Sequence, residues 1–338
     1  MAKKMKTAQT RYFYEMTISS SPHVHSPVTT QTIMRDVLIA LVPALILSVV
    51  FFGFRALTVT LVSMAACTFF EWAWCRLMKV SSKAYDLSAC VTGALLAFVC
   101  PVTIPYWTII LGDLFAIILV KMLFGGLGHN IVNPALAGRA FMFSWPVLMS
   151  TWVKVGFENA APVIGGADIV TAATPLAAMH NYEMPAESLF DMFIGNIGGC
   201  IGETSAVLLL IGFVYLLITK VINPGIPLCY IGTVALLTFL FPMGNDRFMW
   251  MGSQILSGGL MLGAIFMATD YVTSPITRAG QMVYGALCGV LTVIIRYFGG
   301  YNEGVSYAIL IMNACVVLLD RIGRPKKFGA PGKKVAGK

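Results

Sequence analysis

Charged residues are scarce in this chain. Only 11% of its 338 residues are Asp, Glu, Lys or Arg, whereas 58% are hydrophobic. Soluble domains carry roughly 25% charged residues, so this composition excludes an ordinary soluble protein. Apolar runs of about 20 residues, long enough to cross a bilayer, recur from Asp36 onward. The sequence therefore predicts an integral membrane protein.

Patterns that hold metals are also missing. None of the eight cysteines forms a C-x-x-C pair, so an iron–sulfur cluster held by four thiolates of this chain alone is not expected. The four histidines show no ligand spacing for haem or zinc on a shared helix. We interpret the cysteines as small buried side chains, and we predict no metal site. The first 35 residues lack an apolar core, which excludes a cleavable signal peptide.

The apolar segments predict an all-α fold of about ten transmembrane helices. These cover residues 36–54, 56–75, 87–101, 106–123, 134–153, 196–219, 226–241, 249–268, 280–298 and 304–320. The predicted organisation is a cytoplasmic N-terminal segment (1–35), a five-helix half (36–153), a loop (154–195), a second five-helix half (196–320) and a basic tail (321–338).

The basic residues predict the orientation of these helices. All but four of the 23 Lys and Arg residues fall on the side of the two termini, the exceptions being Arg55, Lys154, Arg247 and Arg296. By the positive-inside rule both termini are cytoplasmic, and the 154–195 loop is extracytoplasmic. The net charge of +8 then reflects topology and attraction to lipid headgroups, and it requires no nucleic-acid partner.

A weak internal repeat indicates that the two halves are inverted. Phe124-Gly125-Gly126 closes the fourth predicted span and Phe298-Gly299-Gly300 the ninth. An odd offset of five spans inverts one half relative to the other, a plan that builds central sites from broken helices.

Two acids inside predicted spans are candidates for ion coupling. Asp113 lies in the fourth span, and Glu203 lies in a glycine-rich break of the sixth. A charge at mid-bilayer costs at least ~2.5 kcal/mol on insertion scales, so such acids are seldom without a role. A structural polar contact is the alternative for both.

One short polar motif lies in the predicted extracytoplasmic loop. The segment from Asp168 to Thr174 reads D-x-x-T-x-A-T. It resembles the site at which bacterial flavin transferases attach FMN to the last threonine through a phosphoester. The loop is on the side where an exported transferase would act.

Four further motifs carry a resemblance that covers residues 20 to 322. They are S-P-H-V-H-S-P at Ser21, G-G-L-G-H-N-x-x-N-P-A at Gly125, I-G-E-T-S at Ile201 and F-M-A-T-D-Y-V-T-S-P at Phe266. They resemble the RnfD component of the Rnf complex, an ion-translocating ferredoxin:NAD oxidoreductase. The related NqrB component of the sodium-translocating NADH:quinone oxidoreductase shares most of them and stays an alternative. The short polar N-terminus favours the Rnf component.

The resemblance implies a subunit of a bacterial inner-membrane complex with covalent FMN on Thr174. Asp168, Thr171 and Ala173 would belong to the attachment motif, where Thr171 and Ala172 stand in place of the family's frequent Ser and Gly. A non-covalent riboflavin is a further expectation. Partner subunits would carry iron–sulfur clusters and a second covalent flavin, and NAD and ferredoxin would bind to them. Sodium ions and protons both remain open as the translocated ion.

Two other classes of function fit part of the sequence. A ten-helix channel or secondary transporter would show the same composition and repeat, and so would a scaffold subunit without a chromophore. The Asp168–Thr174 motif favours the flavoprotein over both.

Overall fold

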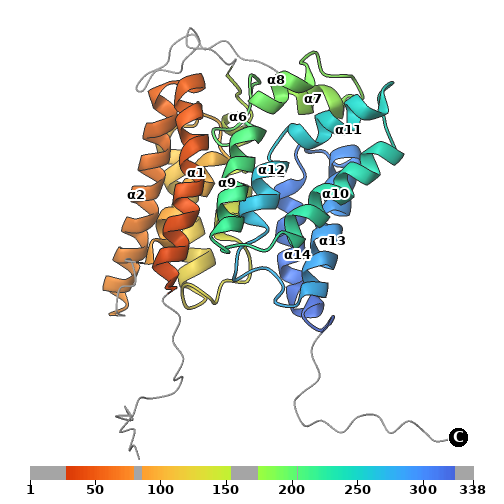
Figure 1. Cartoon of the computed structure of the whole chain (residues 1–338). Coiled ribbons are helices and arrows are strands. Elements are labelled where there is room, and N and C mark those ends of the chain that lie inside the picture. The colour runs from red at the N-terminus through yellow and green to blue at the C-terminus, as the bar shows by residue number, and fades with distance from the viewer. Residues whose placement is uncertain (1–27, 80–85, 154–173, 204, 324–338) are drawn as a thin grey trace, which may run out of the picture.

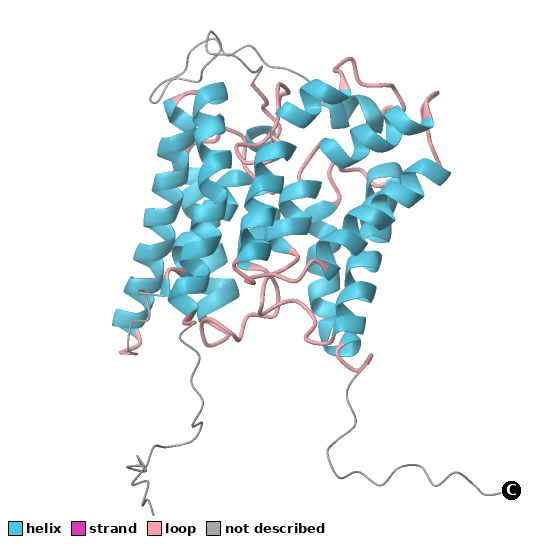
Figure 2. Ribbon diagram, viewed as in Figure 1, coloured by secondary structure: helices cyan, strands magenta, loops and turns pink. Residues whose placement is uncertain are grey.

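A computed structural model describes residues 28–79, 86–153, 174–203 and 205–323 of the chain. The described part is helical and contains no β-strand (Figure 2), which confirms the all-α class. Asp168, Thr171 and Ala173 of the loop motif lie outside the described residues, and Thr174 lies within them.

The helices fall into three groups along the sequence. The first group comprises α1 (Thr30–Phe52), α2 (Phe54–Leu77), α3 (Ser88–Phe98), α4 (Tyr106–Leu114), the π-helix η2 (Phe115–Met122), α5 (Pro134–Met142) and α6 (Pro146–Met149). Two short helices follow, α7 (Pro175–His180) and α8 (Leu189–Ile194). The last group comprises α9 (Ala206–Ile218), α10 (Gly225–Leu240), α11 (Arg247–Leu256), α12 (Leu260–Leu262), the π-helix η4 (Gly263–Met267), α13 (Arg278–Phe298) and α14 (Val305–Leu319).

Several of these helices suit a bilayer by length and composition. Among the described residues, α1, α2 and α13 are long and apolar enough to cross a membrane alone. The pair formed by α11 and the α12–η4 segment passes the same test as one unit, bent by 62° at the break. Helices α3, α9, α10 and α14 are apolar but shorter. The chain is thus a helical membrane protein with several broken or shortened spans.

Glycine positions explain a tight turn and a close helix contact. Gly53 joins α1 to α2 with φ at +80°, a conformation that glycine adopts without the penalty of a side chain. At Gly93 of α3 a Cβ would lie 2.7 Å from the carbonyl oxygen of Ser63 on α2. The backbones of α2 and α3 therefore touch, as small residues allow in membrane helices.

The helix predicted at 196–219 is wrong in its first part. Helix α9 begins at Ala206, and the glycine-rich stretch before it crosses the end of α3 as irregular chain. The amide of Ile201 donates to the carbonyl of Cys100 at 3.0 Å, and that of Gly202 to the carbonyl of Phe98 at 2.8 Å. These bonds occupy carbonyls that the end of α3 leaves free. A Cβ at Gly202 would overlap the Phe98 side chain, so this crossing requires glycine.

The helix predicted at 134–153 is also wrong as a single element. Helix α5 ends at Met142, and Pro146 begins the separate one-turn helix α6. Proline removes a helical hydrogen bond and its ring clashes with the carbonyl four residues earlier.

The two groups of long helices meet in the middle of the molecule. Helix α1 packs against α9, and α5 packs against α14. Within the first group α2 packs on α3, α4 and η2, and within the last group α10 packs on α11 and α13. The start of α1 and the end of α14 lie at one end of the bundle, whereas α7, α8 and α11 lie at the other (Figure 1). We call these the terminal end and the loop end.

Candidate functional site

Thr174 is the first residue of the predicted flavin site that the structure places. It is the N-cap of α7, where its half-buried side chain accepts a hydrogen bond from the amide of Ala177 at 3.3 Å. The residue lines a cavity with an empty volume of about 490 Å³ at the loop end. Trp152, Cys200, Glu203, Gly258 and Glu303 are among the other residues that line it. We call it the loop-end cavity.

Glu203 lines this cavity from the turn before α9, within the glycine-rich stretch where the sequence predicts a break of the sixth span. Its side chain is buried, and Oε1 has no hydrogen-bond partner among the described residues. The guanidinium of Arg139 on α5 lies 3.5 Å from the same oxygen and forms an ion pair with it. The predicted acid is therefore charge-paired but incompletely hydrogen-bonded.

A second carboxylate joins this pair. Glu303, in the loop between α13 and α14, forms an ion pair and a hydrogen bond with Arg139, and it accepts a 2.7 Å hydrogen bond from the amide of Gly259. Arg139 also donates to the hydroxyl of Ser306 at 2.9 Å. Apolar residues of similar volume would stabilise a protein about as well as a buried ion pair does. Removing only one partner of such a pair, however, lowers the stability by about 3–5 kcal/mol. Arg139, Glu203 and Glu303 therefore depend on one another.

Arg296 on α13 holds the broken helix that forms one wall of the cavity. Its guanidinium donates to the carbonyl of Gln254 at 2.5 Å, to the side-chain oxygen of Gln254 at 3.0 Å and to the carbonyl of Ser257 at 3.2 Å. These carbonyls belong to the end of α11, where the chain bends before α12. The arginine thus replaces backbone hydrogen bonds that the break removes.

Sequence reasoning missed three of these residues. The charge pattern gives Arg139 and Arg296 only a topological role, and it gives Glu303 none. A charged residue within an apolar span was the available signal for the two arginines. For Glu303 the signal was its position three residues after the end of the repeated Phe298-Gly299-Gly300 motif.

The second predicted acid belongs to a different place. Asp113 on α4 is fully buried against α2, where one carboxyl oxygen lies 2.7 Å from Ser63 Oγ and 3.2 Å from Cys67 Sγ. Its other oxygen has no hydrogen-bond partner among the described residues. Asp113 and Glu203 are therefore not parts of one site.

A larger cavity opens toward the terminal end, with an empty volume of about 750 Å³. Ser88, Lys121, Asn130, Asn133 and Asp270 supply polar side chains among many apolar lining residues. We call it the terminal-end cavity.

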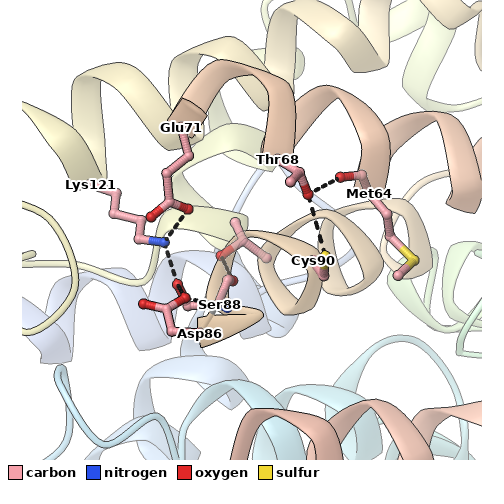
Figure 3. Close-up of polar contacts among 8 residues, drawn as sticks. Met64, Thr68, Glu71, Asp86, Ser88, Cys90 and Lys121 are labelled. Atoms are coloured by element: carbon pink, nitrogen blue, oxygen red, sulfur yellow. Dashed lines mark hydrogen bonds and ion pairs between the residues drawn. The ribbon is translucent and has the colours of Figure 1, made fainter. Parts of the chain in front are cut away.

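Lys121 enters this cavity as part of a buried polar cluster. Its ammonium lies 3.0 Å from Glu71 Oε2 and 2.6 Å from Ser88 Oγ, and Ser88 in turn contacts Asp86 (Figure 3). Helices α2 and α3 and the π-helix η2 each contribute to this cluster.

All eight cysteines are free, and no three His, Cys, Asp or Glu side chains of the described ranges gather as a metal site would require. His129 and His180, the two histidines within those ranges, share no helix.

Comparisons with known proteins agree on one family. Residues 17–329 match the NQR2, RnfD, RnfE family. The D component of the Na⁺-translocating ferredoxin:NAD⁺ oxidoreductase complex of Acetobacterium woodii is 43% identical, covering 93% of this chain and 95% of that protein. The D component of the proton-translocating ferredoxin:NAD⁺ oxidoreductase complex of Clostridium ljungdahlii is 41% identical, covering 93% and 96%. The D component of the ion-translocating oxidoreductase complex of Escherichia coli O7:K1 is 35% identical, covering 92% and 98%. The chain belongs to the NQR2, RnfD, RnfE family.

Proposed function

We propose that this chain is the RnfD component of an Rnf-type complex, an ion-translocating ferredoxin:NAD oxidoreductase, and that it carries FMN covalently on Thr174. The relatives' names support the complex. The observation that carries the flavin proposal is that Thr174 lines the same cavity as the buried acids Glu203 and Glu303. A redox group there would lie beside titratable groups in the interior of the protein, as coupling of electron and ion transfer requires.

The residues around the cavity are compatible with a flavin. Gly198, Gly199 and Gly258 line the cavity, so part of its wall has no side chains. Trp152 and Leu176 offer apolar surface for a ring system, while Asn302 offers an amide. The flavin would supply one- and two-electron redox chemistry. Thr174 would fix it, and Arg139 and Arg296 would offset negative charge near it.

For ion coupling we propose Glu203 first and Asp113 second. Glu203 lines the cavity and has one oxygen without a hydrogen-bond partner among the described residues, so it can bind a cation or a proton when the local charge changes. Sequence identity does not indicate which ion is translocated, because the relative that is 43% identical is named for Na⁺ and the relative that is 41% identical is named for protons.

We further propose the ten-span topology of two inverted five-helix halves in a bacterial inner membrane, with both termini cytoplasmic. The packing of α1 on α9 and of α5 on α14 supports it, as does the common end for the start of α1 and the end of α14 (Figure 1). One Phe-Gly-Gly motif follows η2 and the other begins at the last residue of α13, and these two helices occupy corresponding places in the two groups.

The remaining partners follow from what the described chain offers. Iron–sulfur clusters, a second covalent flavin and the sites for ferredoxin and NAD would belong to other subunits, and a flavin transferase would attach the FMN. The terminal-end cavity is our candidate for a non-covalent riboflavin, because amide, hydroxyl and ammonium groups line an otherwise apolar space.

One observation separates this function from a transporter or a scaffold subunit. We expect ultraviolet-excited flavin fluorescence to stay with the protein band after denaturing electrophoresis of the assembled complex. A channel, a secondary transporter or a scaffold would give a dark band.

A further inference from the structure

Asp113 is a buried carboxyl group that forms no ion pair with any cationic side chain in the described part of the chain. Its side chain is 0% exposed between α4 and α2. Among the described residues no ion pair includes it, and its Oδ2 has no hydrogen-bond partner. Ionised and unpaired, such a group would be far more costly to bury than a neutral carboxylic acid.

The charged groups in this part of the bundle do not compensate for Asp113. Lys121 of η2 already contacts Glu71 of α2 at 3.0 Å and Ser88 of α3 at 2.6 Å (Figure 3). That pair is neutral as a unit. The faces of α2 and α3 toward Asp113 present Ser63, Cys67 and the Gly93 carbonyl, and α5 presents Met142 beside Gly112. An ionised Asp113 would leave a net negative charge in this interior.

The hydrogen bonds of Ser63 also indicate a protonated Asp113. A hydroxyl has one proton to donate, yet Ser63 Oγ lies 2.9 Å from the Gly93 carbonyl and 2.7 Å from Asp113 Oδ1. If Ser63 donates to Gly93, it can only accept from Asp113, which then needs a proton of its own. Only a protonated Asp113 lets both short contacts be hydrogen bonds.

The hydrogen-bonded groups at Asp113 favour a proton over a metal cation. Hard cations take about six or more oxygen ligands. Asp113, Ser63 and the Gly93 carbonyl supply the oxygens of this hydrogen-bonded group, and its fourth member is the thiol of Cys67. Thiolates and thioethers are ligands of soft metals.

We propose that Asp113 is a proton-binding site that holds a neutral carboxyl group at neutral pH and does not bind Na⁺. Cys67 and Glu71 lie one turn apart on α2, a rise of ~6 Å, and Lys121, the ion-pair partner of Glu71, lines the terminal-end cavity. The π-helix η2 starts two residues after Asp113, and π-helical segments are frequent at functional sites. The use of this proton in ion coupling rests on the proposed function, whereas its presence does not.

Infrared spectroscopy of the purified complex in lipid nanodiscs tests the proposal. The spectrum of the wild type minus that of Asp113→Asn should show the carbonyl band of a protonated carboxyl group. The band should persist from mildly acidic to mildly alkaline pH and shift in D₂O. Asp246→Asn is the matched control, because Asp246 is an exposed N-cap and asparagine preserves capping. Its difference spectrum should show only an ionised carboxylate.

A second measurement needs no variant. Wild type grown with aspartate labelled with ¹³C in the carboxyl group should show the same band at lower frequency. Flavin bands cancel both in the spectrum of wild type minus Asp113→Asn and in that of unlabelled minus labelled wild type. The result therefore does not depend on FMN at Thr174. Loss of carboxylate bands alone in Asp113→Asn, or no protonated aspartate in the labelled protein, would overturn the proposal. So would disappearance of the band when Na⁺ replaces K⁺.

Discussion

Glu203 and Glu303 meet over a single glycine. A Cβ placed on Gly259 would overlap Oε1 of Glu203 and Oε1 of Glu303 at once. The two carboxylates thus share the space that a side chain would fill, with Arg139 paired to both. One acid precedes α9 and the other precedes α14, so this contact joins the start of the last helix group to its end.

Gly259→Ala should push the carboxylates of Glu203 and Glu303 away from Gly259. The backbone of Gly259, with φ at −76°, suits alanine, so the effect is steric. Overpacking of this kind costs about 1–3 kcal/mol, and we expect a lower melting temperature by fluorescence-detected size-exclusion chromatography. Gly232→Ala on α10 is the control, because a Cβ there meets nothing within 4 Å. Equal melting temperatures for both variants would show that the carboxylates can move apart freely.

Arg139→Met should strongly destabilise the protein. It leaves Glu203 and Glu303 close together without their shared cation, and breaking a buried ion pair costs about 3–5 kcal/mol. Adding Glu203→Gln and Glu303→Gln removes the uncompensated charges, so the triple variant should recover most of the folded yield. A triple variant as unstable as Arg139→Met would assign the loss to packing around the arginine.

Glu203→Gln should separate ion coupling from flavin attachment. Glutamine preserves shape and hydrogen bonding but removes the charge, so the protein should assemble and keep its flavin. Redox-driven ion uptake into vesicles that contain the complex should fall several-fold. Glu183→Gln, at an exposed position between α7 and α8, should have no effect. Normal ion uptake in a correctly assembled Glu203→Gln complex would leave the acid a structural role.

The predicted topology can be measured by cysteine labelling. In a background without native cysteines, Glu183→Cys should react with a membrane-impermeant thiol reagent in intact cells. Lys79→Cys, exposed in the turn after α2, should react only after the membrane is opened. The reverse pattern would make attachment of FMN by an exported transferase implausible.

The sequence predicted the helices better than the site. Long apolar runs determine where α1, α2 and α13 lie, whereas the start of α9 depends on glycines that cross the end of α3. Thr174 and Glu203 were predicted from local motifs, and the structure brings them to one cavity. Arg139 and Glu303 could not be paired by sequence reasoning, because their contact joins α5 to the α13–α14 loop. Such a contact follows from tertiary packing, which a single sequence does not display.

Flavin fluorescence of the Thr174→Ala variant tests the central claim most directly. The complex that contains Thr174→Ala should assemble, and its band should be dark under ultraviolet light after denaturing electrophoresis. Thr151→Ala, a second threonine at the loop end, should fluoresce like the wild type. Fluorescence that survives in Thr174→Ala would contradict covalent FMN at this residue.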